Sequence, residues 1–540
     1  MTDFLSQDWL LPFLLYAQTH YRFRYFFSYL RKREPEFIAD APHRIEPRQP
    51  LPVLILCKDA HHYPCILHSL SVTVRANNHV VLEKQLLDSP VVLTESYWWQ
   101  VFHLEPNMGS GSLLVDVTFD LEVDGKRKLY HNDNHRTSTH KPLRVYRSKD
   151  PLPGYKGLVW GDCHTHSNFT EDQVEFGSPL EASALLCKSM GLSFFCVTDH
   201  SYDLDDRLDN YLVNDPTLPK WKLLRQTIDG LNNRENAFVT IRGEEISCRN
   251  FHGNNVHMIL LGNRSFFPGS GDSAERWFQT RSEMSVQEIL LAKEEHAVAV
   301  AAHPFEKVPL LQRLLLGRGA WAEEDLEHSA LTGIQFANGG RDSGFESGYR
   351  HWIRCLLDGK RLLAVGGNDA HGNFNRFRQV GIPFIMIRES NQQLFGKLRT
   401  GVFLDSPLSE QTLLNNIRLG RTIVSDGPAL NLIIEGENHA TSIGSEHVGG
   451  SFQFEIEAKS TVDYGAIDHV KVLKGIIGGN AGEQLILERT ALKLYEWREP
   501  FSVKIEQPCY LRAEIFTEGH QAYDQQPHFA MTNPLWLKPL

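Results

Sequence analysis

The sequence predicts an α/β domain in the middle of the chain with a β domain on each side. Between residues 156 and about 428, apolar runs rich in β-branched residues alternate with amphipathic stretches of helical period, a pattern typical of parallel α/β domains. On both sides of this region, short strand-like runs are separated by turn residues, which is typical of β-sandwiches. We therefore predict three domains, residues 1–155, 156–428 and 429–540.

The composition is typical of a soluble globular protein. The chain has 540 residues, of which 41% are hydrophobic and 22% charged. Its formal net charge is −11, so it lacks the basic field on which general nucleic-acid binding depends, which argues against nucleic acid as a partner. The eight cysteines form no CxxC pair, which predicts free thiols and a cytoplasmic location. We expect a small-molecule substrate and no membrane partner, and the sequence leaves the oligomeric state open.

The predicted N-terminal domain opens with an aromatic segment at residues 4–31. The apolar run inside it, 9–17, has acidic residues before it and is too short to span a bilayer. We predict a packed helix, with an interfacial membrane helix as the alternative. The strand-like runs that follow are 53–57, 71–75, 79–82 and 112–121, and residues 148–154 form a predicted linker.

The central domain contains seven predicted strands, at 157–160, 193–198, 237–242, 297–302, 333–336, 362–366 and 381–387. One helix between them has a clear start, because Ser178 can cap it, Pro179 suits the first helical position and Glu181 can close a capping box. This helix should end near Gly191. The alternation indicates a parallel α/β domain, either open or barrel-shaped. The C-terminal domain has predicted strands at 452–458, 469–473, 501–505 and 510–517.

Histidine and carboxylate residues follow five of the central strands, and a sixth apolar run contains another histidine. They are His164 and His166, Asp199 and His200, Glu244 and Glu245, His303, Asp369 and His371, with His257 in the run 256–261. Because the carboxyl ends of parallel strands meet on one face, these side chains should converge. Imidazole and carboxylate are good ligands for zinc, manganese and iron. Each motif alone is often only a turn, a helix cap or a loop, but together they predict a metal site.

These residues resemble the motifs of the PHP (polymerase and histidinol phosphatase) family. The matching stretches are 161–167 (GDCHTHS), 197–200 (VTDH), 243–247 (GEEIS), 257–262 (HMILLG), 302–304 (AHP) and 367–371 (GNDAH). Residues 420–428 and 532–536 resemble its carbaryl-hydrolase-like branch. The resemblance implies a distorted (β/α)7 barrel, similar to a TIM barrel, that holds two or three divalent metal ions.

The resemblance also implies a ligand set. It assigns the first ion to His164, His166, Glu245 and Asp369, the second to Glu245, His257 and His303, and the third to Asp172, His200 and His371. Catalysis would centre on His164, His166, Glu245, Asp369 and His371. Two choices stay open: Glu171 could replace Asp172, and Glu244 is adjacent to Glu245 but faces the opposite way if the strand continues.

The function that this set implies is hydrolysis by a metal-bound hydroxide, with a small phosphorylated molecule or nucleotide as the substrate. A carbamate, amide or ester hydrolase is the first alternative, and a binding protein with an inert barrel is the second. Asp199 is a candidate for orienting a ligand histidine. Arg376 is either a contact for an anionic substrate or an exposed surface arginine.

Overall fold

The computed structural model describes residues 34–540 with short gaps at 106–108, 136–137, 171–176, 235–236, 272–280, 309–312, 314–315, 342–343, 377–378, 383–384, 389–392, 437–439 and 520–525. The predicted N-terminal helix, Glu171 and Asp172 therefore lie outside the described residues. The chain forms two compact units. The first combines Met1–Asp150, Ser167–Gly191 and Ala370–Phe395, and the second combines Pro151–His166, Leu192–Asp369 and Gly396–Leu540. The predicted three-domain division stays a prediction.

The first unit is built mainly of antiparallel strands in two sheets. One sheet has the order β1-β3-β7, and the other has the order β2-β10-β8-β4-β5, with β6 beside β4 and β9 beside β8. Along β8, alternate residues from Leu113 to Val123 are buried, which is the period of a strand with one face in a core. Buried side chains of both sheets form one hydrophobic cluster, in which Phe37 and Phe119 lie with ring centres 5.5 Å apart.

The elements of the first unit are β1 (Glu36–Asp40), β2 (Arg44–Ile45), β3 (Leu51–Lys58), β4 (Cys65–Ala76), β5 (His79–Gln85), β6 (Val91–Leu93), β7 (Tyr97–Leu104), β8 (Gly111–Val123), β9 (Lys126–His131), β10 (Leu143–Arg147), α2 (Leu180–Ser189), β20 (Ala370–His371), β21 (Gln379–Ile382) and β22 (Ile385–Arg388). Helix α2 forms where a helix was predicted, but its N-cap is Pro179 and no side chain caps it, so the expected capping box is absent there. The helix ends before Gly191, whose φ of +87° is favourable for glycine. The run 381–387, predicted as one strand, belongs instead to the β21–β22 hairpin.

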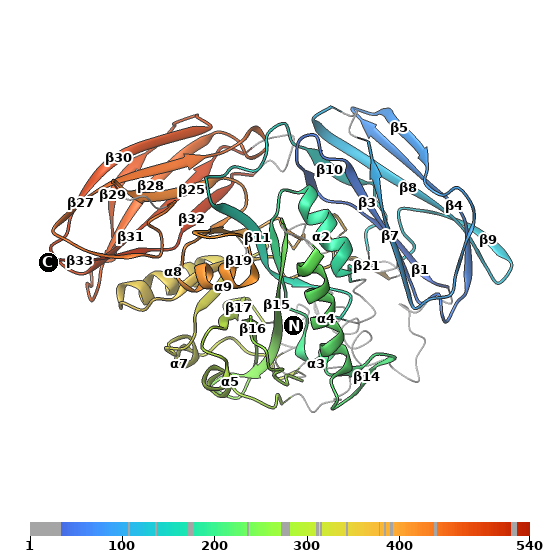
Figure 1. The fold of residues 1–540 in the computed structure, drawn as a ribbon, viewed down its shortest axis with the longest axis horizontal. Helices are drawn as coiled ribbons and strands as arrows, with labels where there is room; N and C mark the ends of the chain where they lie inside the picture. Colours follow the sequence, from blue (N-terminus) through green and yellow to red (C-terminus); the bar gives the residue numbers. More distant parts are fainter. Residues whose placement is uncertain are drawn as a thin grey trace, which may run out of the picture. The chain divides into compact units, whose positions relative to one another are not determined.

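The second unit contains a long mixed sheet with the order β19-β18-β17-β16-β15-β12-β11-β23-β24-β32-β31-β28-β29. The elements of its first part are β11 (Leu158–His166), β12 (Phe194–Val197), α3 (Ser201–Leu204), β13 (Asp206–Arg207), β14 (Asn210–Asn214), α4 (Pro219–Arg234), β15 (Val239–Arg249), β16 (Asn255–Leu261), α5 (Val286–Ala292), β17 (Val298–Ala302), α7 (Glu323–Leu326), β18 (Gly333–Asn338), α8 (Phe345–Leu357), β19 (Leu363–Gly367), β23 (Arg399–Phe403), α9 (Glu410–Arg418) and β24 (Thr422–Ser425). Figure 1 shows β15, β16 and β17 side by side in green.

The predicted fold class, a distorted (β/α)7 barrel similar to a TIM barrel, is wrong. Strand accounts for 44% of the structure and helix for only 15%, whereas such a barrel has a helix after every strand. Only residues 250–254 separate β15 from β16. Because parallel neighbours need a longer crossover, β16 runs antiparallel to β15, and it is antiparallel to β17 as well. On the other side, β11 pairs antiparallel with β23, and the hydrogen-bonded order continues into the C-terminal strands.

The C-terminal strands extend the same sheet and add a second one. The second sheet has the order β25-β27-β30. The elements are β25 (Ala429–Ile434), β26 (Glu446–Val448), β27 (Ser451–Lys459), β28 (Ile467–Ile476), β29 (Glu483–Arg489), β30 (Glu496–Lys504), β31 (Cys509–Thr517), β32 (Phe529–Thr532) and β33 (Leu535–Lys538), with a 3-10 turn at Val462–Tyr464. Tyr510, Phe529 and Met531 share a hydrophobic cluster with Trp352 of α8, so the strands and this helix have a common core.

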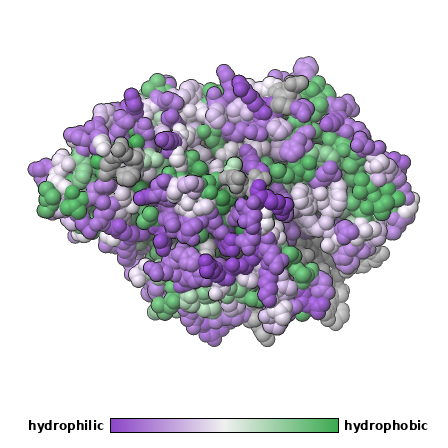
Figure 2. Space-filling model, viewed as in Figure 1, coloured by the Kyte–Doolittle hydropathy of each residue, from purple (hydrophilic) through white to green (hydrophobic). Residues whose placement is uncertain are grey.

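The hydropathy of the surface and the state of the cysteines are those expected from the sequence. Hydrophilic residues cover much of the face drawn in Figure 2, and hydrophobic residues show there as separate patches. All eight cysteines are buried thiols rather than members of disulfides, as predicted. Among the described helices, none has both the length and the hydropathy to cross a bilayer.

Candidate metal centre

Four of the predicted ligands of the first ion lie together in the second unit. His164 and His166 are at the end of β11, Glu245 is in β15, and Asp369 follows β19. The amide of Asp369 donates to the carbonyl of His164 at 2.9 Å, which holds the end of β19 against β11. One ligand atom from each of the four residues can be chosen so that all lie within 4.8 Å of one another. This part of the predicted site therefore assembles as a His/Asp/Glu cluster that could hold a metal ion.

The imidazole nitrogens and carboxylate oxygens of these four residues converge on one point. Nε2 of His164 is 3.4 Å from Oε1 of Glu245 and 3.3 Å from Oδ1 of Asp369. Nε2 of His166 is 3.1 Å from the same Asp369 oxygen and 3.4 Å from Oε2 of Glu245. Nε2 of His164 and Oε2 of Glu245 are buried, and neither makes a hydrogen bond to the described residues. A cation between these atoms would satisfy both, since buried polar atoms normally have a partner.

A second group shares Glu245. His200 places Nδ1 3.1 Å from Oε2 of Glu245, and His257 places Nδ1 3.0 Å from Oε1. Ligand atoms of these three residues also lie within 4.8 Å of one another. Nε2 of His303 is 3.3 Å from Oε1 of Glu245. Because both groups use the carboxylate of Glu245, it can bridge two adjacent ions, as the resemblance implies.

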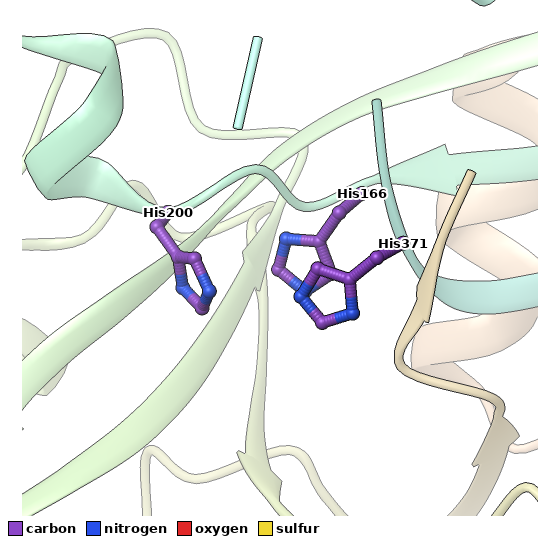
Figure 3. A group of neighbouring side chains, drawn as sticks. All are labelled: His166, His200 and His371. Carbon is purple, nitrogen blue, oxygen red and sulfur yellow. The ribbon is translucent and has the colours of Figure 1, made fainter. Parts of the chain in front are cut away.

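His200 lies close to other predicted ligands. Its imidazole is beside His257 and Glu245, with a ring centre 4.4 Å from that of His166, and its assignment to a third ion, which the resemblance implies, stays a prediction. Figure 3 shows the rings of His166 and His200 next to each other. His371 belongs to β20 of the first unit, so its share in the centre stays a prediction. Asp172 and Glu171 lie outside the described residues, and their roles also stay predictions.

Two of the predicted ligand residues have a backbone conformation that residues other than glycine seldom adopt. The φ angle is +52° at Asp369 and +30° at His303. Such angles cost about 1–3 kcal/mol each and persist where the surrounding structure enforces them, often at functional sites. The surrounding structure therefore holds these two side chains at the cluster at a cost in backbone conformational energy.

Burial and neighbouring charges set the protonation of the cluster. Burial raises the pKa of Glu245, but the imidazoles of His257, His164 and His166 outweigh it and hold the pKa well below its usual range. Burial lowers the pKa of His166, but its hydrogen bond to Asp369 and the negative charge of Glu245 hold it well above the usual value. Burial, with the charge of His166, lowers the pKa of His200 to about 4. These shifts favour an anionic Glu245, a protonated His166 and a neutral His200; neutral imidazole is the form that binds metals, so a bound cation would have to displace the proton of His166.

Residues behind the ligands hold them in place. Oε1 of Gln335 lies 2.8 Å from Nδ1 of His164. The buried carboxylate of Asp162 accepts hydrogen bonds from the amides of His164 and Asn368, both at 3.2 Å, and from Nδ2 of Asn368 at 2.6 Å. It therefore ties β11 to the turn that carries Asp369. Asn368 thus helps to hold the ligands in place. The sequence analysis did not identify Gln335 as a supporting residue, and the one feature that could have indicated it is that Gln335 is a polar residue within an apolar predicted strand.

Glu244 and Glu245 face opposite sides of β15, as strand alternation requires. Glu244 accepts a hydrogen bond from Oγ of Ser201 at 3.2 Å and from the amide of Phe267, also at 3.2 Å. Burial raises its pKa well above the usual value. Glu245 is therefore the residue of the pair that faces the cluster.

Arg376 has neither of the roles considered for it. It is buried in the first unit, where Nε donates to the carbonyl of Ala39 at 2.9 Å and Nη1 donates to the carbonyls of Thr139 and Lys141. Its Nη1 is also 3.6 Å from Asp133. Both predictions for Arg376, a substrate contact and an exposed surface arginine, are wrong, because these main-chain acceptors fix the side chain inside the unit.

For Asp199, the structure shows its carbonyl accepting from the amide of Glu245 at 3.0 Å, and the predicted side-chain role stays a prediction.

Another arginine, Arg318, does reach the cluster. The segment around it pairs with the start of β16: the amide of Asn255 donates to the Gly317 carbonyl at 2.8 Å, and the amide of Gly319 donates to the Asn255 carbonyl at 3.0 Å. This pairing places Nη2 of Arg318 3.1 Å from Nε2 of His257. Nothing in the sequence distinguished Arg318 from other arginines, because its contact with His257 depends on the pairing of residues 317–319 with the start of β16.

Comparisons with known proteins do not assign a family. No family model matches the chain, and no curated protein is similar to it. A β-glucuronidase of Bacteroides uniformis aligns at 9% identity and a TM-score of 0.17, covering 94% of this chain and 61% of its own. A glycosyl hydrolase family 2 member from Bacteroides cellulosilyticus DSM 14838 aligns at 13% identity and a TM-score of 0.17, covering 93% and 63%. The chain thus spans about three fifths of the length of these proteins, and alignments at such TM-scores assign neither fold nor activity.

Proposed function

We propose that the chain is a metal-dependent hydrolase related to the PHP family and that it acts on a phosphoester of a small molecule. The observation that carries this proposal is the approach of Arg318 to the His/Asp/Glu cluster, with Nη2 3.1 Å from Nε2 of His257. A half-buried guanidinium beside a metal cluster suits a phosphate, which it can bind through two parallel hydrogen bonds. An aryl carbamate, the rival substrate, offers no such anion.

The residues of the cluster fit divalent cations. Glu245 and Asp369 supply carboxylate oxygens, and His164, His166, His200 and His257 supply imidazole nitrogens, a set that suits zinc, manganese or iron. When bound, such cations lower the pKa of water and neutralise charge on a phosphoryl oxygen. Within the chain, Glu245 holds the two groups of histidines around one carboxylate, and Arg318 would bind and orient the phosphate.

The proposal is tested by a substrate panel on the wild type and three variants. The full-length protein is freed of metal, reloaded with zinc or manganese, and assayed on phosphomonoesters, phosphodiesters and aryl carbamates. Arg318→Ala should lower kcat/KM for the phosphoester by about 10- to 100-fold, the worth of a charged hydrogen bond, and Arg318→Lys should restore part of it. Arg350→Ala, which removes an exposed arginine of α8, should leave turnover unchanged.

Three results would contradict the proposal. Turnover of aryl carbamates alone would identify the rival hydrolase, and turnover that survives complete metal removal would rule out metal-dependent chemistry. If Arg318→Ala lowered metal content rather than the affinity for phosphoester, Arg318 would support His257 and not the substrate.

A further inference from the structure

A second cluster of aromatic and charged side chains lies where α8 meets the C-terminal strands, and it shares no residue with the metal centre. Arg341 precedes α8, and its guanidinium carbon is 5.0 Å from the ring centre of Phe516 and 5.3 Å from those of Phe345 and Phe529. The three rings, which we call the aromatic cage, come from α8, β31 and β32. Several aromatic faces around one positive charge are the arrangement with which proteins bind ammonium and guanidinium groups.

The walls of the cage are fixed by the core behind them. Phe345 and Phe529 are each 2% exposed, and their ring centres are 5.6 Å apart. The ring of Phe345 also lies 5.4 Å from that of Phe336 in β18. Arg341, by contrast, is exposed. Its side chain can therefore leave the cage for water while the rings keep their places.

A cavity of about 90 Å³ opens beside the cage and is lined by Tyr349, Glu346, Glu514 and Met531 as well as the three rings. This volume corresponds to a few water molecules and suits the head group of a small ligand. The cavity and the cage together form one preformed pocket with aromatic walls and a few polar groups, as ligand sites usually have.

The fixed charges around this pocket favour a cation. Arg512 is fully buried between two carboxylates: its Nη1 donates to Glu514 at 2.5 Å and its Nη2 donates to Glu483 at 2.6 Å. Arg512 and Lys471, which lies opposite Glu514 on β28, balance these two carboxylates, and the exposed carboxylate of Glu346 at the lining leaves one negative charge in excess. The charge that Arg341 brings to the cage offsets this excess, so a cation that replaced Arg341 would meet the same favourable field.

We propose that this pocket binds a small organic cation, with a quaternary ammonium or guanidinium head, in the aromatic cage that the Arg341 guanidinium occupies. Such cations are weakly hydrated and spread their charge over a surface that fits aromatic faces. Arg341 then acts as an internal competitor that the ligand displaces. The proposal does not depend on the chemistry of the metal centre.

The test compares choline with 3,3-dimethyl-1-butanol, its uncharged isostere, and with guanidinium, using saturation-transfer NMR on the full-length protein. The wild type should bind choline more tightly than the isostere by about 3- to 30-fold, the worth of a cation–π contact. Arg341→Ala should bind choline more tightly than the wild type by a similar factor, because the internal competitor is gone. Arg350→Ala is the matched control and should bind like the wild type.

A change in the cage should remove the preference. Phe516 is half-buried, so Phe516→Leu in the Arg341→Ala background should fold and lose the advantage of choline over the isostere. If that variant does not fold, Glu346→Lys at the exposed lining should weaken choline binding instead. Equal binding of choline and its isostere would overturn the proposal. Binding of choline only by the Arg341→Ala variant would also overturn it, because it would show that Arg341 does not leave the aromatic cage in the wild type.

Discussion

Oε1 of Gln335 lies 2.8 Å from Nδ1 of His164, and this contact sets the tautomer of a central ligand of the candidate metal centre. The amide group of Gln335 is oriented by its other end, since Nε2 donates to Oδ1 of Asn338 at 3.1 Å. An amide oxygen can only accept, so Nδ1 of His164 carries the proton. The lone pair of Nε2 is therefore directed at Glu245 and Asp369, where a cation would bind.

Replacing Gln335 should weaken metal binding without removing a ligand. In Gln335→Leu, His164 loses the acceptor that orients it, and we expect zinc or manganese affinity to fall by about 10- to 100-fold. Competition with a chromophoric chelator measures this affinity. Gln335→Glu keeps an acceptor and should lose less. Equal affinity in wild type and Gln335→Leu would show that the contact does not position His164.

His303→Ala should abolish most of the activity while the protein stays folded. Its Nε2 is 3.3 Å from the shared carboxylate of Glu245, and its side chain is 12% exposed, so its removal opens little core. We expect turnover to fall by about 100-fold or more and the content of bound metal to decrease. Metal analysis, turnover and circular dichroism are measured together. His252→Ala, at a side chain 60% exposed, is the control, and full turnover of His303→Ala would remove His303 from the site.

Arg376→Ala should act on stability rather than on catalysis. The substitution leaves the carbonyls of Ala39 and Lys141 and the carboxylate of Asp133 buried without their cation. Loss of one member of a buried ion pair costs about 3–5 kcal/mol of unfolding free energy. Thermal unfolding should show a lower Tm, while the metal affinity of the folded protein stays unchanged. Arg144→Ala, at an exposed position of β10, should leave Tm unchanged, and an unaltered Tm in Arg376→Ala would contradict the structural role.

The stability of the first unit should depend on the protonation of Asp40. Burial raises the pKa of Asp40 from 3.8 to about 6, although it accepts hydrogen bonds from the amides of Phe374 and Ala41. A raised pKa means that the folded state holds the proton more tightly than the unfolded chain. The resulting stabilisation is complete below about pH 4 and is lost as the pH rises to about 6, a change of about 3 kcal/mol.

The comparison of wild type with Asp40→Asn isolates this effect. The Tm of the wild type minus that of Asp40→Asn should decrease as the pH is raised from 4 to 7, because only the wild type has a carboxyl group to ionise at this position. Asp124→Asn, in an exposed turn, provides the background pH dependence. A difference in Tm that stays constant over this range would mean that Asp40 does not titrate in the folded protein.

The candidate site could be predicted better than the fold that carries it. Histidines and carboxylates at the ends of apolar runs were visible in the sequence, and six of them, His164, His166, His200, Glu245, His257 and Asp369, form the two groups around Glu245. The barrel prediction failed because strand direction depends on the connection between strands as well as on apolar periodicity. The run 256–261 follows β15 after residues 250–254 alone, which leaves no room for a helix and makes β16 antiparallel.

The sequence by itself identified the imidazoles and carboxylates that gather in the candidate centre and set Glu244 and Glu245 on opposite faces, because residue type and strand alternation are local properties. Only the tertiary structure decided which residues support and surround them. Gln335 reaches His164 across 171 positions of the chain, Arg318 reaches His257 through the pairing of residues 317–319 with β16, and Arg376 is bound inside the first unit by main-chain carbonyls. These contacts join segments distant in sequence, and the packing that creates them leaves no periodic signal in the chain.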